Sequence, residues 1–348
     1  MLKDFSKILL KWYDQNKRDL PWRRTKDPYK IWISEIMLQQ TTVNTVIAYY
    51  DKWIKIFPTI QDLAKTPIQT VLKQWQGLGY YNRARNLHKS ALILVDEHNG
   101  IIPKDPKIIR SLPGFGPYST GSVLSIAYDV PLTIIDANVR RVIMRILGLP
   151  GLADTKQDLK INDYLLKVLP QKRAGDFNQA LMELGALICR SNKPLCSSCP
   201  INNYCVAYKE GKQEIIPETK KKIITDIHAV IGIIKKGNKY FIQKRSSQGL
   251  LADLWEFPGG KIEKGETKTK ALARELKEEI GVKLISSKHL FDVQHFYTQF
   301  RVNLSVFDCV LENDPIIDSS HRWVSFKDFT QYPMPSGSVK IINKLIKK

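Results

Sequence analysis

Four cysteines close together in the sequence constrain the fold more than any other feature. Cys189, Cys196, Cys199 and Cys205 have the spacing C-x6-C-x2-C-x5-C. Four thiolates at such intervals can surround one soft metal centre, either a zinc ion or an iron–sulfur cluster. Structural zinc sites more often contain two C-x2-C pairs, and only one such pair occurs here. Cys309, the fifth cysteine, lies alone in an apolar stretch and is interpreted as a buried core thiol.

The composition is that of a globular protein with a strong positive charge. The 348 residues include 54 Lys and Arg against 34 Asp and Glu, which gives a net charge of +20. Such a charge favours a nucleic-acid partner, although solubility or a lysine-rich composition explains it equally well. No apolar run approaches the roughly 18 residues of a membrane helix, and the first ten residues do not resemble a signal peptide. We therefore expect a cytoplasmic protein, in which clustered cysteines bind metal and do not form disulfides.

The pattern of apolar residues divides the chain into two domains of different class. In residues 1–212 apolar side chains recur at spacings of three and four, for example over Ile31–Phe57, which predicts an all-helical domain. Residues 213–224 are rich in Lys, Glu and Pro and predict a linker. Residues 225–348 combine strand patterns with a helix at Ala271–Ile280, which predicts an α+β domain. The larger excess of positive charge lies in the first domain, so we expect DNA to bind there.

Two carboxylates stand out in the helical domain. Glu35 follows Ile31 and Trp32 by four and three residues and shares their helix face. A carboxylate on an apolar face is costly unless it is paired or functional. Burial would raise its pKa and suit a general acid, whereas the alternative is an interface acid paired with an arginine. Asp136 directly precedes a predicted helix, where it suits an N-cap and can still project into a pocket.

A short glycine-rich turn provides a third feature. Residues 112–116 read Leu-Pro-Gly-Phe-Gly and match the turn of a helix-hairpin-helix. Gly114 and Gly116 let the backbone approach a ligand closely, and N–H groups at the following helix start can hold a phosphate. A plain turn between two helices is the alternative. Together, this turn and the cysteine spacing resemble the endonuclease III and MutY superfamily of DNA glycosylases. That resemblance implies a structural [4Fe–4S] cluster in the loop 189–205.

The resemblance also implies the chemistry. Endonuclease III relatives carry a lysine two residues after the hairpin, where it forms an imine and drives strand cleavage. This chain has Tyr118 there, and a phenol cannot form an imine. Ser34–Thr41 (S-E-I-M-L-Q-Q-T) resembles the MutY segment whose glutamate protonates adenine, which implies this role for Glu35. Asp136 would stabilise the cationic sugar, as in a retaining glycosidase. Tyr118 and Asn138 would support these two acids.

The resemblance to the family also implies which residues would contact DNA. Tyr80 matches the MutY residue that intercalates beside the oxidised guanine when adenine is flipped out, and the alternative is a core tyrosine at a helix start. Three residues would contact the oxidised guanine or fill its stack: Gln39, Gln40 and Thr41. Three basic residues at helical spacing suit either phosphate contact or a solvated face: Arg83, Arg85 and His88.

The second domain contains a complete Nudix box. Gly260–Val282 fits G-x5-E-x7-R-E-L-x-E-E-x-G-V. Three of its glutamates share one helix face and suit Mg²⁺ beside a diphosphate: Glu275, Glu278 and Glu279. A charged solvent face is the alternative. The C-terminal domain of MutY relatives resembles the hydrolase MutT but usually lacks this box, and it reads oxidised guanine through a Phe-Ser-His loop. Here Tyr297-Thr298-Gln299 aligns with that loop, and His295 is retained upstream.

These observations predict a multidomain protein, with an all-α helix-hairpin-helix glycosylase domain followed by an α+β Nudix-like domain. We expect a monofunctional adenine DNA glycosylase of base excision repair. Its partner would be double-stranded DNA containing adenine opposite 8-oxoguanine or guanine. The Nudix box adds a candidate pyrophosphatase acting on an oxidised nucleoside triphosphate. We expect a monomer associated with the nucleoid and not with a membrane. The alternatives are an endonuclease III-like glycosylase/lyase, a protein that is mainly a Nudix hydrolase, or a non-catalytic DNA-binding protein.

Overall fold

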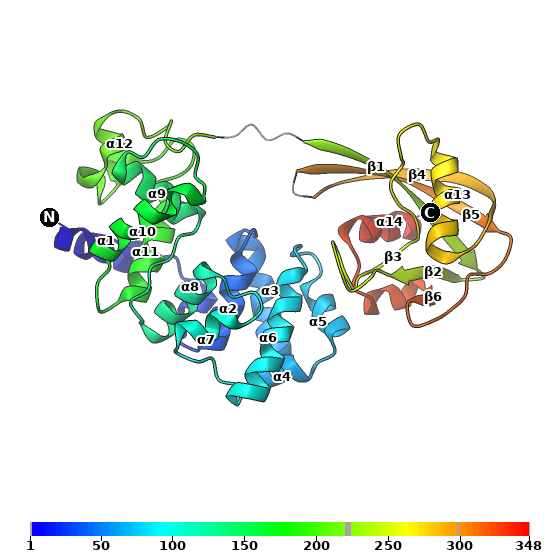
Figure 1. The fold of residues 1–348 in the computed structure, drawn as a ribbon, viewed down its shortest axis with the longest axis horizontal. Helices are drawn as coiled ribbons and strands as arrows, with labels where there is room; N and C mark the ends of the chain where they lie inside the picture. Colours follow the sequence, from blue (N-terminus) through cyan, green and yellow to red (C-terminus); the bar gives the residue numbers. More distant parts are fainter. Residues whose placement is uncertain (1, 220–223, 298, 348) are drawn as a thin grey trace. The chain divides into compact units, whose positions relative to one another are not determined.

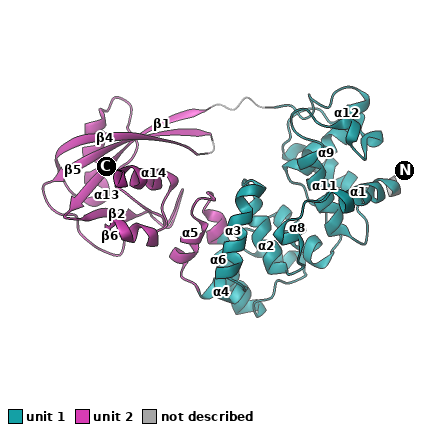
Figure 2. Ribbon diagram, turned by 180° about the vertical axis from the view of Figure 1, so that it is seen from behind, with its two compact units in different colours: residues 1–65, 86–221 teal, residues 66–85, 222–348 magenta. Residues whose placement is uncertain are grey.

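The computed structural model describes residues 2–219, 224–297 and 299–347. The chain forms two compact units, of which unit 1 comprises residues 1–65 and 86–221 and unit 2 comprises residues 66–85 and 222–348 (Figure 2). In the part of the chain that the structure describes, no helix is both long and apolar enough to cross a membrane.

Unit 1 is built from helices, as the sequence predicts (Figure 1). The α-helices that lie in it wholly or in part are α1 (Leu2–Asn16), α2 (Pro28–Leu38), α3 (Val43–Ile56), α4 (Ile60–Lys65), α6 (Asn82–His98), α7 (Pro106–Ser111), α8 (Pro117–Tyr128), α9 (Ala137–Leu147), α10 (Asp158–Val168), α11 (Ala174–Leu187) and α12 (Val206–Lys209). One apolar core joins α1, α9, α10 and α11, with Phe5, Ile143 and Phe177 fully buried in it. This core supports the start of α9 and the face of α11 from which candidate site residues project.

Helix α2 is buried on nearly all sides. Asp27 accepts hydrogen bonds from the backbone N–H groups of Tyr29 and Lys30, and Pro28 occupies the first helical position, so the start of the helix is capped. The predicted helical run over Ile31–Phe57 is in fact interrupted, because Gln40 adopts a φ of 62° between α2 and α3. The interruption ends α2 immediately after the segment that carries Glu35.

The turn between α7 and α8 requires glycine. Gly114 has a φ of 82°, which is strained for residues with a side chain. A Cβ atom at Gly114 would also lie 2.9 Å from Cβ of Asn86 on α6. Gly116 is the N-cap of α8 and offers no side chain to cap it, so the first N–H groups of α8 are available to a ligand. The predicted helix-hairpin-helix is therefore present.

Unit 2 contains a six-stranded mixed sheet among its described residues, with helices packed against it (Figure 1). Its elements are α5 (Ile68–Trp75), β1 (Thr225–Lys236), β2 (Lys239–Lys244), β3 (Trp255–Glu256), α13 (Lys268–Ile280), β4 (Leu284–Tyr297), β5 (Phe300–Leu311), β6 (His321–Ser325) and α14 (Ser336–Ile346). The strand order is β3-β2-β1-β5-β4, with β6 on β2; β1 and β5 run parallel, and β4 and β5 antiparallel. Two separate apolar clusters form the core, one with Leu272 and Leu276 of α13 and one with Ile341 and Ile342 of α14.

The unit boundaries differ from the predicted domain boundaries in two places. Residues 66–85, expected within the helical domain, belong to unit 2, where Trp255 Nε1 donates to Gln69 Oε1 at 2.9 Å. The predicted linker, residues 213–224, begins inside unit 1, because Ile216 is buried in its core and accepts a hydrogen bond from Arg145 Nε at 2.7 Å. Charge and proline content alone did not reveal that residues 213–219 pack against a folded unit.

Candidate active site

Glu35 and Tyr118 form a buried pair. Only 4% of Glu35 is exposed on α2, and its Oε2 accepts a hydrogen bond of 2.7 Å from Tyr118 Oη at the start of α8. Burial raises the pKa of Glu35, although hydrogen bonds from Tyr118 and Ser122 act in the opposite direction. Burial also raises the pKa of Tyr118 well above its usual value, so the phenol keeps its proton and acts as the donor. Glu35 therefore has the environment of a carboxylic acid whose pKa lies above its usual value, as a general acid requires.

Asp136 is held differently, at the N-cap of α9. Its Oδ1 accepts from the Val139 backbone N–H at 2.6 Å, and its Oδ2 accepts from Asn138 Nδ2 at 3.1 Å. Burial raises the pKa of Asp136, but these two hydrogen bonds and the nearby Arg141 favour the ionised form. Asp136 therefore serves as the predicted N-cap and also faces a pocket. Burial is the largest influence, so the pKa of Asp136 stays above its usual value, while its hydrogen-bond partners and Arg141 stabilise the carboxylate when it forms.

A cavity of about 250 Å³ in unit 1 joins these groups. Its lining includes all four predicted catalytic residues: Glu35, Tyr118, Asp136 and Asn138. Apolar walls come from Leu20, Trp22 and Leu38. A cavity with apolar walls and a few convergent polar groups is the expected form of a site for a flat organic ligand.

The cavity also contains an ionic network that the sequence analysis missed. Glu183 on α11 is 1% exposed, and both of its carboxylate oxygens accept hydrogen bonds from Arg18 and Arg23, at 2.6 to 3.1 Å. Burial alone would raise the pKa of Glu183, but the two arginines outweigh it and lower the pKa to about 2. The network places a permanent negative charge and two guanidinium groups at the pocket wall. About 160 residues separate the partners in sequence, so no local motif could indicate the pairing.

A chain of hydrogen bonds connects the cysteine loop to Asp136. Arg141 donates from Nε to the Cys189 carbonyl oxygen at 2.9 Å and from Nη2 to Asn138 Oδ1 at 2.9 Å. Asn138 in turn donates to Asp136. Arg141 also donates to the Gly185 carbonyl oxygen on α11 at 2.7 Å. The position of Asp136 therefore depends on backbone that leads into the cysteine loop.

The four clustered cysteines line one small cavity of about 30 Å³ in unit 1. All four are half-buried and free of disulfides. The buried Arg145 donates from Nη1 to Cys189 Sγ at 3.3 Å. The four thiols share the lining of this cavity, and thiolates are ligands of both zinc ions and iron–sulfur clusters, so the residues fit a soft metal centre.

The predicted DNA-contacting residues lie in several places. Thr41 lines the catalytic cavity, Gln39 donates from Nε2 to Ser119 Oγ at 3.1 Å, and Gln40 is exposed in the turn after α2. Gly114 and Gly116 form the hairpin. Tyr80 belongs to unit 2, and its ring centroid lies 6.2 Å from that of Tyr297. Thr298, predicted beside Tyr297, lies outside the described residues.

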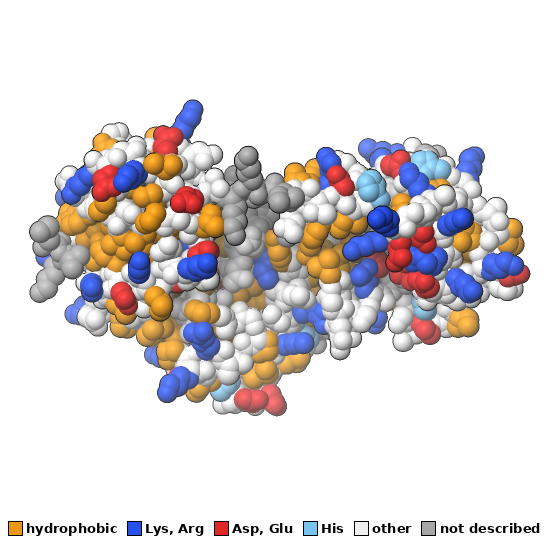
Figure 3. Space-filling view, turned by 45° about the horizontal axis from the view of Figure 1, so that its top comes forward, with side chains coloured by type: hydrophobic (Ala, Val, Ile, Leu, Met, Phe, Trp, Pro, Cys, Tyr) orange, Lys and Arg blue, Asp and Glu red, His pale blue; other side chains and the backbone are white. Residues whose placement is uncertain are grey.

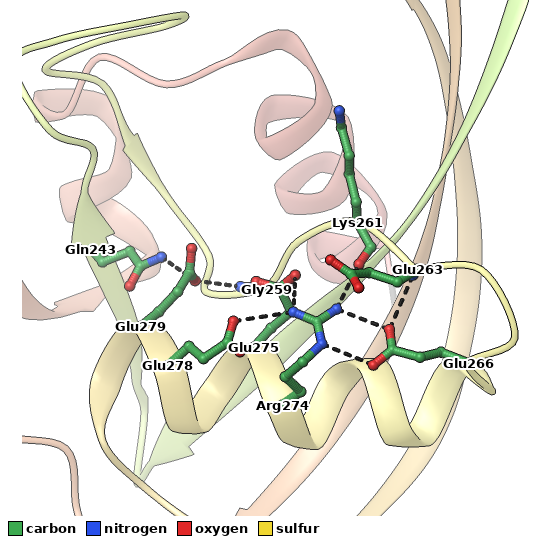
Figure 4. Close-up of polar contacts among 9 residues, drawn as sticks. All are labelled: Gln243, Gly259, Lys261, Glu263, Glu266, Arg274, Glu275, Glu278 and Glu279. Atoms are coloured by element: carbon green, nitrogen blue, oxygen red, sulfur yellow. Dashed lines mark hydrogen bonds and ion pairs between the residues drawn. The ribbon is translucent and has the colours of Figure 1, made fainter.

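The glutamates of the Nudix box surround an arginine (Figure 4). Arg274 pairs with Glu266 at 2.8 Å, Glu275 at 2.9 Å and Glu278 at 3.1 Å. Glu279 instead accepts hydrogen bonds from the Gly259 backbone N–H and the Gln243 side chain. The three predicted metal ligands therefore share α13, as the spacing predicts, but Arg274 engages two of them.

Charged side chains are unevenly arranged on the surface shown in Figure 3. Lys and Arg side chains are spread over both units, and acidic side chains are scattered among them, with one group close together in unit 2. The net charge of +20 is thus carried by many separate basic residues, which suits contacts with a polyanion along its length.

Comparisons with known proteins agree with these features. Residues 33–171 match the model of the HhH-GPD superfamily of base excision DNA repair proteins, and residues 229–344 match the NUDIX domain. The chain is similar to the solved structure of a thermostable thymine-DNA glycosylase, with a TM-score of 0.55 and 32% identity over 60% of this chain and 97% of that chain. A trapped endonuclease III–DNA intermediate shares the fold, with a TM-score of 0.52, 24% identity and coverage of 61% and 98%. The protein is a DNA N-glycosylase of the helix-hairpin-helix superfamily.

The family within that class follows from full-length relatives. The chain is 35% identical to the adenine DNA glycosylase of Buchnera aphidicola (subsp. Schizaphis graminum) over 97% of both chains. It is 32% identical to the adenine DNA glycosylase of Homo sapiens over 97% of this chain and 73% of that protein. The chain belongs to the adenine DNA glycosylase family, and the predicted resemblance and two-domain fold class are confirmed.

Proposed function

We propose that this protein hydrolyses the N-glycosidic bond of adenine opposite 8-oxoguanine or guanine in duplex DNA. The observation that carries the proposal is the Glu35–Tyr118 pair in a cavity that Asp136 also lines. A protonated Glu35 gives its proton to the adenine ring, so the base leaves as a neutral molecule. Ionised Asp136 stabilises the positive charge that develops on the sugar.

The ionic network suits recognition of the base itself. Adenine offers an amine donor and ring nitrogen acceptors at its edge. The Glu183 carboxylate is engaged by Arg18 and Arg23, so it orients these side chains, and Arg23, which lines the cavity, keeps a buried Nε–H without a hydrogen-bond partner as a donor to a ring nitrogen. Trp22 and Leu20 supply apolar contact for the flat ring. We propose that these side chains hold the flipped adenine against Glu35, which keeps the proton transfer short.

We propose that the reaction is monofunctional. Strand cleavage through an imine needs an amine nucleophile, and the hydroxyl of Tyr118 is engaged with Glu35. In the part of the chain that the structure describes, no lysine lines the catalytic cavity. An endonuclease III-like lyase would need one there.

Several further roles complete the proposal for duplex DNA. Gly114 and Gly116 hold a backbone phosphate at the uncapped start of α8. Tyr80 fills the gap left by the flipped adenine, beside Tyr297, and these two rings meet the oxidised guanine. Three residues around the end of α2 contact the oxidised guanine or fill its stack: Gln39, Gln40 and Thr41. His295 lies on β4 and supports this region from the sheet.

We propose that the four cysteines hold a [4Fe–4S] cluster. The shared cavity and the thiol chemistry of its lining support this assignment. When bound, the cluster supplies a structural crosslink of the loop 189–205. Two arginines hold the loop in place: Arg145 donates a hydrogen bond to Cys189, and Arg141 connects the loop to Asn138.

A second candidate function is Mg²⁺-dependent hydrolysis of an oxidised nucleoside triphosphate in unit 2. The acidic group of Figure 4 favours it, as does the half-buried Glu256, whose pKa burial raises to about 7. Glu275, Glu278 and Glu279 would hold Mg²⁺ only after Arg274 releases the first two. The test is release of pyrophosphate from oxidised dGTP with Mg²⁺, using Glu278→Gln as the matched variant. Equal turnover by both proteins would exclude this site.

The principal experiment is a single-turnover measurement of adenine release. Duplexes carry adenine opposite 8-oxoguanine, opposite guanine, or opposite thymine as a matched pair. We expect release from the first two, fastest opposite 8-oxoguanine, and strands that break only after alkali. Release that ignores the opposite base would contradict the proposed specificity. Breaks that borohydride traps as a covalent complex would contradict monofunctional chemistry.

A further inference from the structure

The loop that presents Tyr80 has a strained backbone. Gly77, Gly79 and Tyr80 have φ values of 106°, 70° and 48°. Positive φ is readily adopted by glycine, but it costs a residue with a side chain roughly 1–2 kcal/mol. Such a conformation persists only where the surroundings determine it. Neighbouring groups must therefore hold Tyr80 in place.

Arg83, one turn after Tyr80, makes the contacts that could hold this loop. Its Nη2 donates to the carbonyl oxygens of Leu78 and Gly79, both at 3.1 Å. Its guanidinium carbon lies 5.2 Å from the Trp75 ring centroid and 5.5 Å from the Tyr80 ring centroid. Both distances are within the range of a cation–π interaction. The guanidinium thus contacts the backbone just before Tyr80 and also the tyrosine ring.

Trp75 completes the arrangement. Its Nε1 donates to the Gly79 carbonyl oxygen at 3.0 Å, so this oxygen accepts from both Trp75 and Arg83. The indole is fully buried at the end of α5. Burial lowers the pKa of Arg83 to about 10, which still leaves the side chain charged near neutral pH. The charge is therefore retained inside the loop.

Sequence spacing had offered a phosphate contact as one role for the basic residues that follow Tyr80. Arg83 is instead half-buried, with its guanidinium directed at its own loop. Arg85 is also engaged within unit 2, with the Ser247 carbonyl oxygen and Asp253. Lys89, further along α6, is exposed and provides a matched cation for comparison.

We infer that Arg83 is a positioning residue that holds Tyr80 in the orientation in which it enters the DNA. This inference rests on the proposed intercalating role of Tyr80. The planar guanidinium can donate to two carbonyls and face two rings at once, whereas an ammonium group cannot reproduce that geometry. Removing it frees the Tyr80 backbone to leave its strained conformation, and the ring then enters the DNA less often.

The test measures flipping directly, by 2-aminopurine fluorescence. 2-Aminopurine replaces the target adenine opposite 8-oxoguanine, and its fluorescence increases when it leaves the base stack. The four proteins compared all carry Glu35→Gln, so no base is released: the parent, Tyr80→Leu, Arg83→Met and Lys89→Met. We expect Arg83→Met to lower the flipped fraction roughly ten-fold, as Tyr80→Leu does, because a cation–π contact and charged hydrogen bonds are lost. Lys89→Met should match the parent.

A double-variant cycle separates positioning from general destabilisation. If Arg83 acts through Tyr80, the variant carrying Tyr80→Leu and Arg83→Met flips the base no less than the weaker single variant. Additive losses would overturn the inference. Arg83→Lys should give a flipped fraction between those of the parent and Arg83→Met, and it should unfold at the parent's thermal midpoint. A flipped fraction equal to the parent's in both Arg83→Lys and Arg83→Met would also overturn the inference.

The two possible failures are distinguishable. If Tyr80→Leu flips the base as well as the parent does, the intercalating role fails and the inference fails with it. If Tyr80→Leu is impaired and Arg83→Met is not, the positioning role alone is wrong.

Discussion

The ionic network of Glu183 makes a quantitative prediction about stability. Glu183→Gln keeps the shape of the side chain but leaves Arg18 and Arg23 without their buried counter-charge. The pKa of Glu183 falls from an ordinary 4.5 to about 2 in the fold, and each pKa unit corresponds to about 1.36 kcal/mol. The carboxylate therefore contributes about 3 kcal/mol. Removing one partner of a buried pair typically costs roughly 3–5 kcal/mol, which agrees.

The sign of the pH dependence follows from the same pKa. A carboxylate whose pKa is lowered by folding stabilises the native state above its unfolded pKa and loses that contribution in acid. The difference in unfolding free energy between the wild type and Glu183→Gln should be full at pH 7. It should shrink as the pH falls from about 4.5 towards 2.

Urea unfolding followed by far-ultraviolet circular dichroism is a suitable assay, because Glu183 lies in the helical unit. Asp19→Asn is the matched control, since Asp19 and Arg24 pair at 2.5 Å but are 73% and 64% exposed. Exposed pairs contribute little, so this variant should unfold close to the wild-type midpoint. If Glu183→Gln also unfolded near that midpoint, or if its difference from wild type were the same at pH 4 and pH 7, the reasoning would be refuted.

Three further predictions concern the site and its supports. Tyr118→Phe removes the 2.7 Å hydrogen-bond donor to Glu35 and so raises the pKa of Glu35 further. The alkaline limb of the single-turnover rate against pH should therefore move to higher pH. Movement to lower pH would contradict this role of Tyr118. Cys199→Ser should reduce the broad visible absorbance of the purified protein and its iron content, whereas full retention of both would exclude Cys199 as a ligand. Gly114→Ala, at a φ of 82° and with its Cβ 2.9 Å from Asn86, should lower stability by roughly 1–2 kcal/mol and weaken duplex binding measured by fluorescence anisotropy; unchanged binding would argue against the phosphate role.

Local motifs made much of the site predictable. The cysteine spacing, the glycine-rich turn and the capping position of Asp136 each depend on neighbours within a few residues, so their geometry is encoded in short segments. Glu35 could be predicted from the sequence for a related reason, because an acid among apolar residues at helical spacing indicates a buried side chain.

Long-range pairing could not be predicted in the same way. The Glu183 network joins residues far apart in sequence, and its members look like ordinary charged residues in their own segments. Residues 66–85 have helical periodicity typical of the first domain, yet contacts such as Gln69 with Trp255 assign them to unit 2. The break after α2 was missed because Gln40 carries no glycine or proline signal for its positive φ.

The most direct test of the central claim is adenine release by the wild type and by Glu35→Gln from a duplex with adenine opposite 8-oxoguanine. We predict free adenine and an alkali-labile but unbroken strand with the wild type. Glu35→Gln should bind the same duplex with similar affinity and release no adenine. Release that persists in Glu35→Gln, or wild-type strand cleavage through a borohydride-trapped imine without adenine release, would contradict the account.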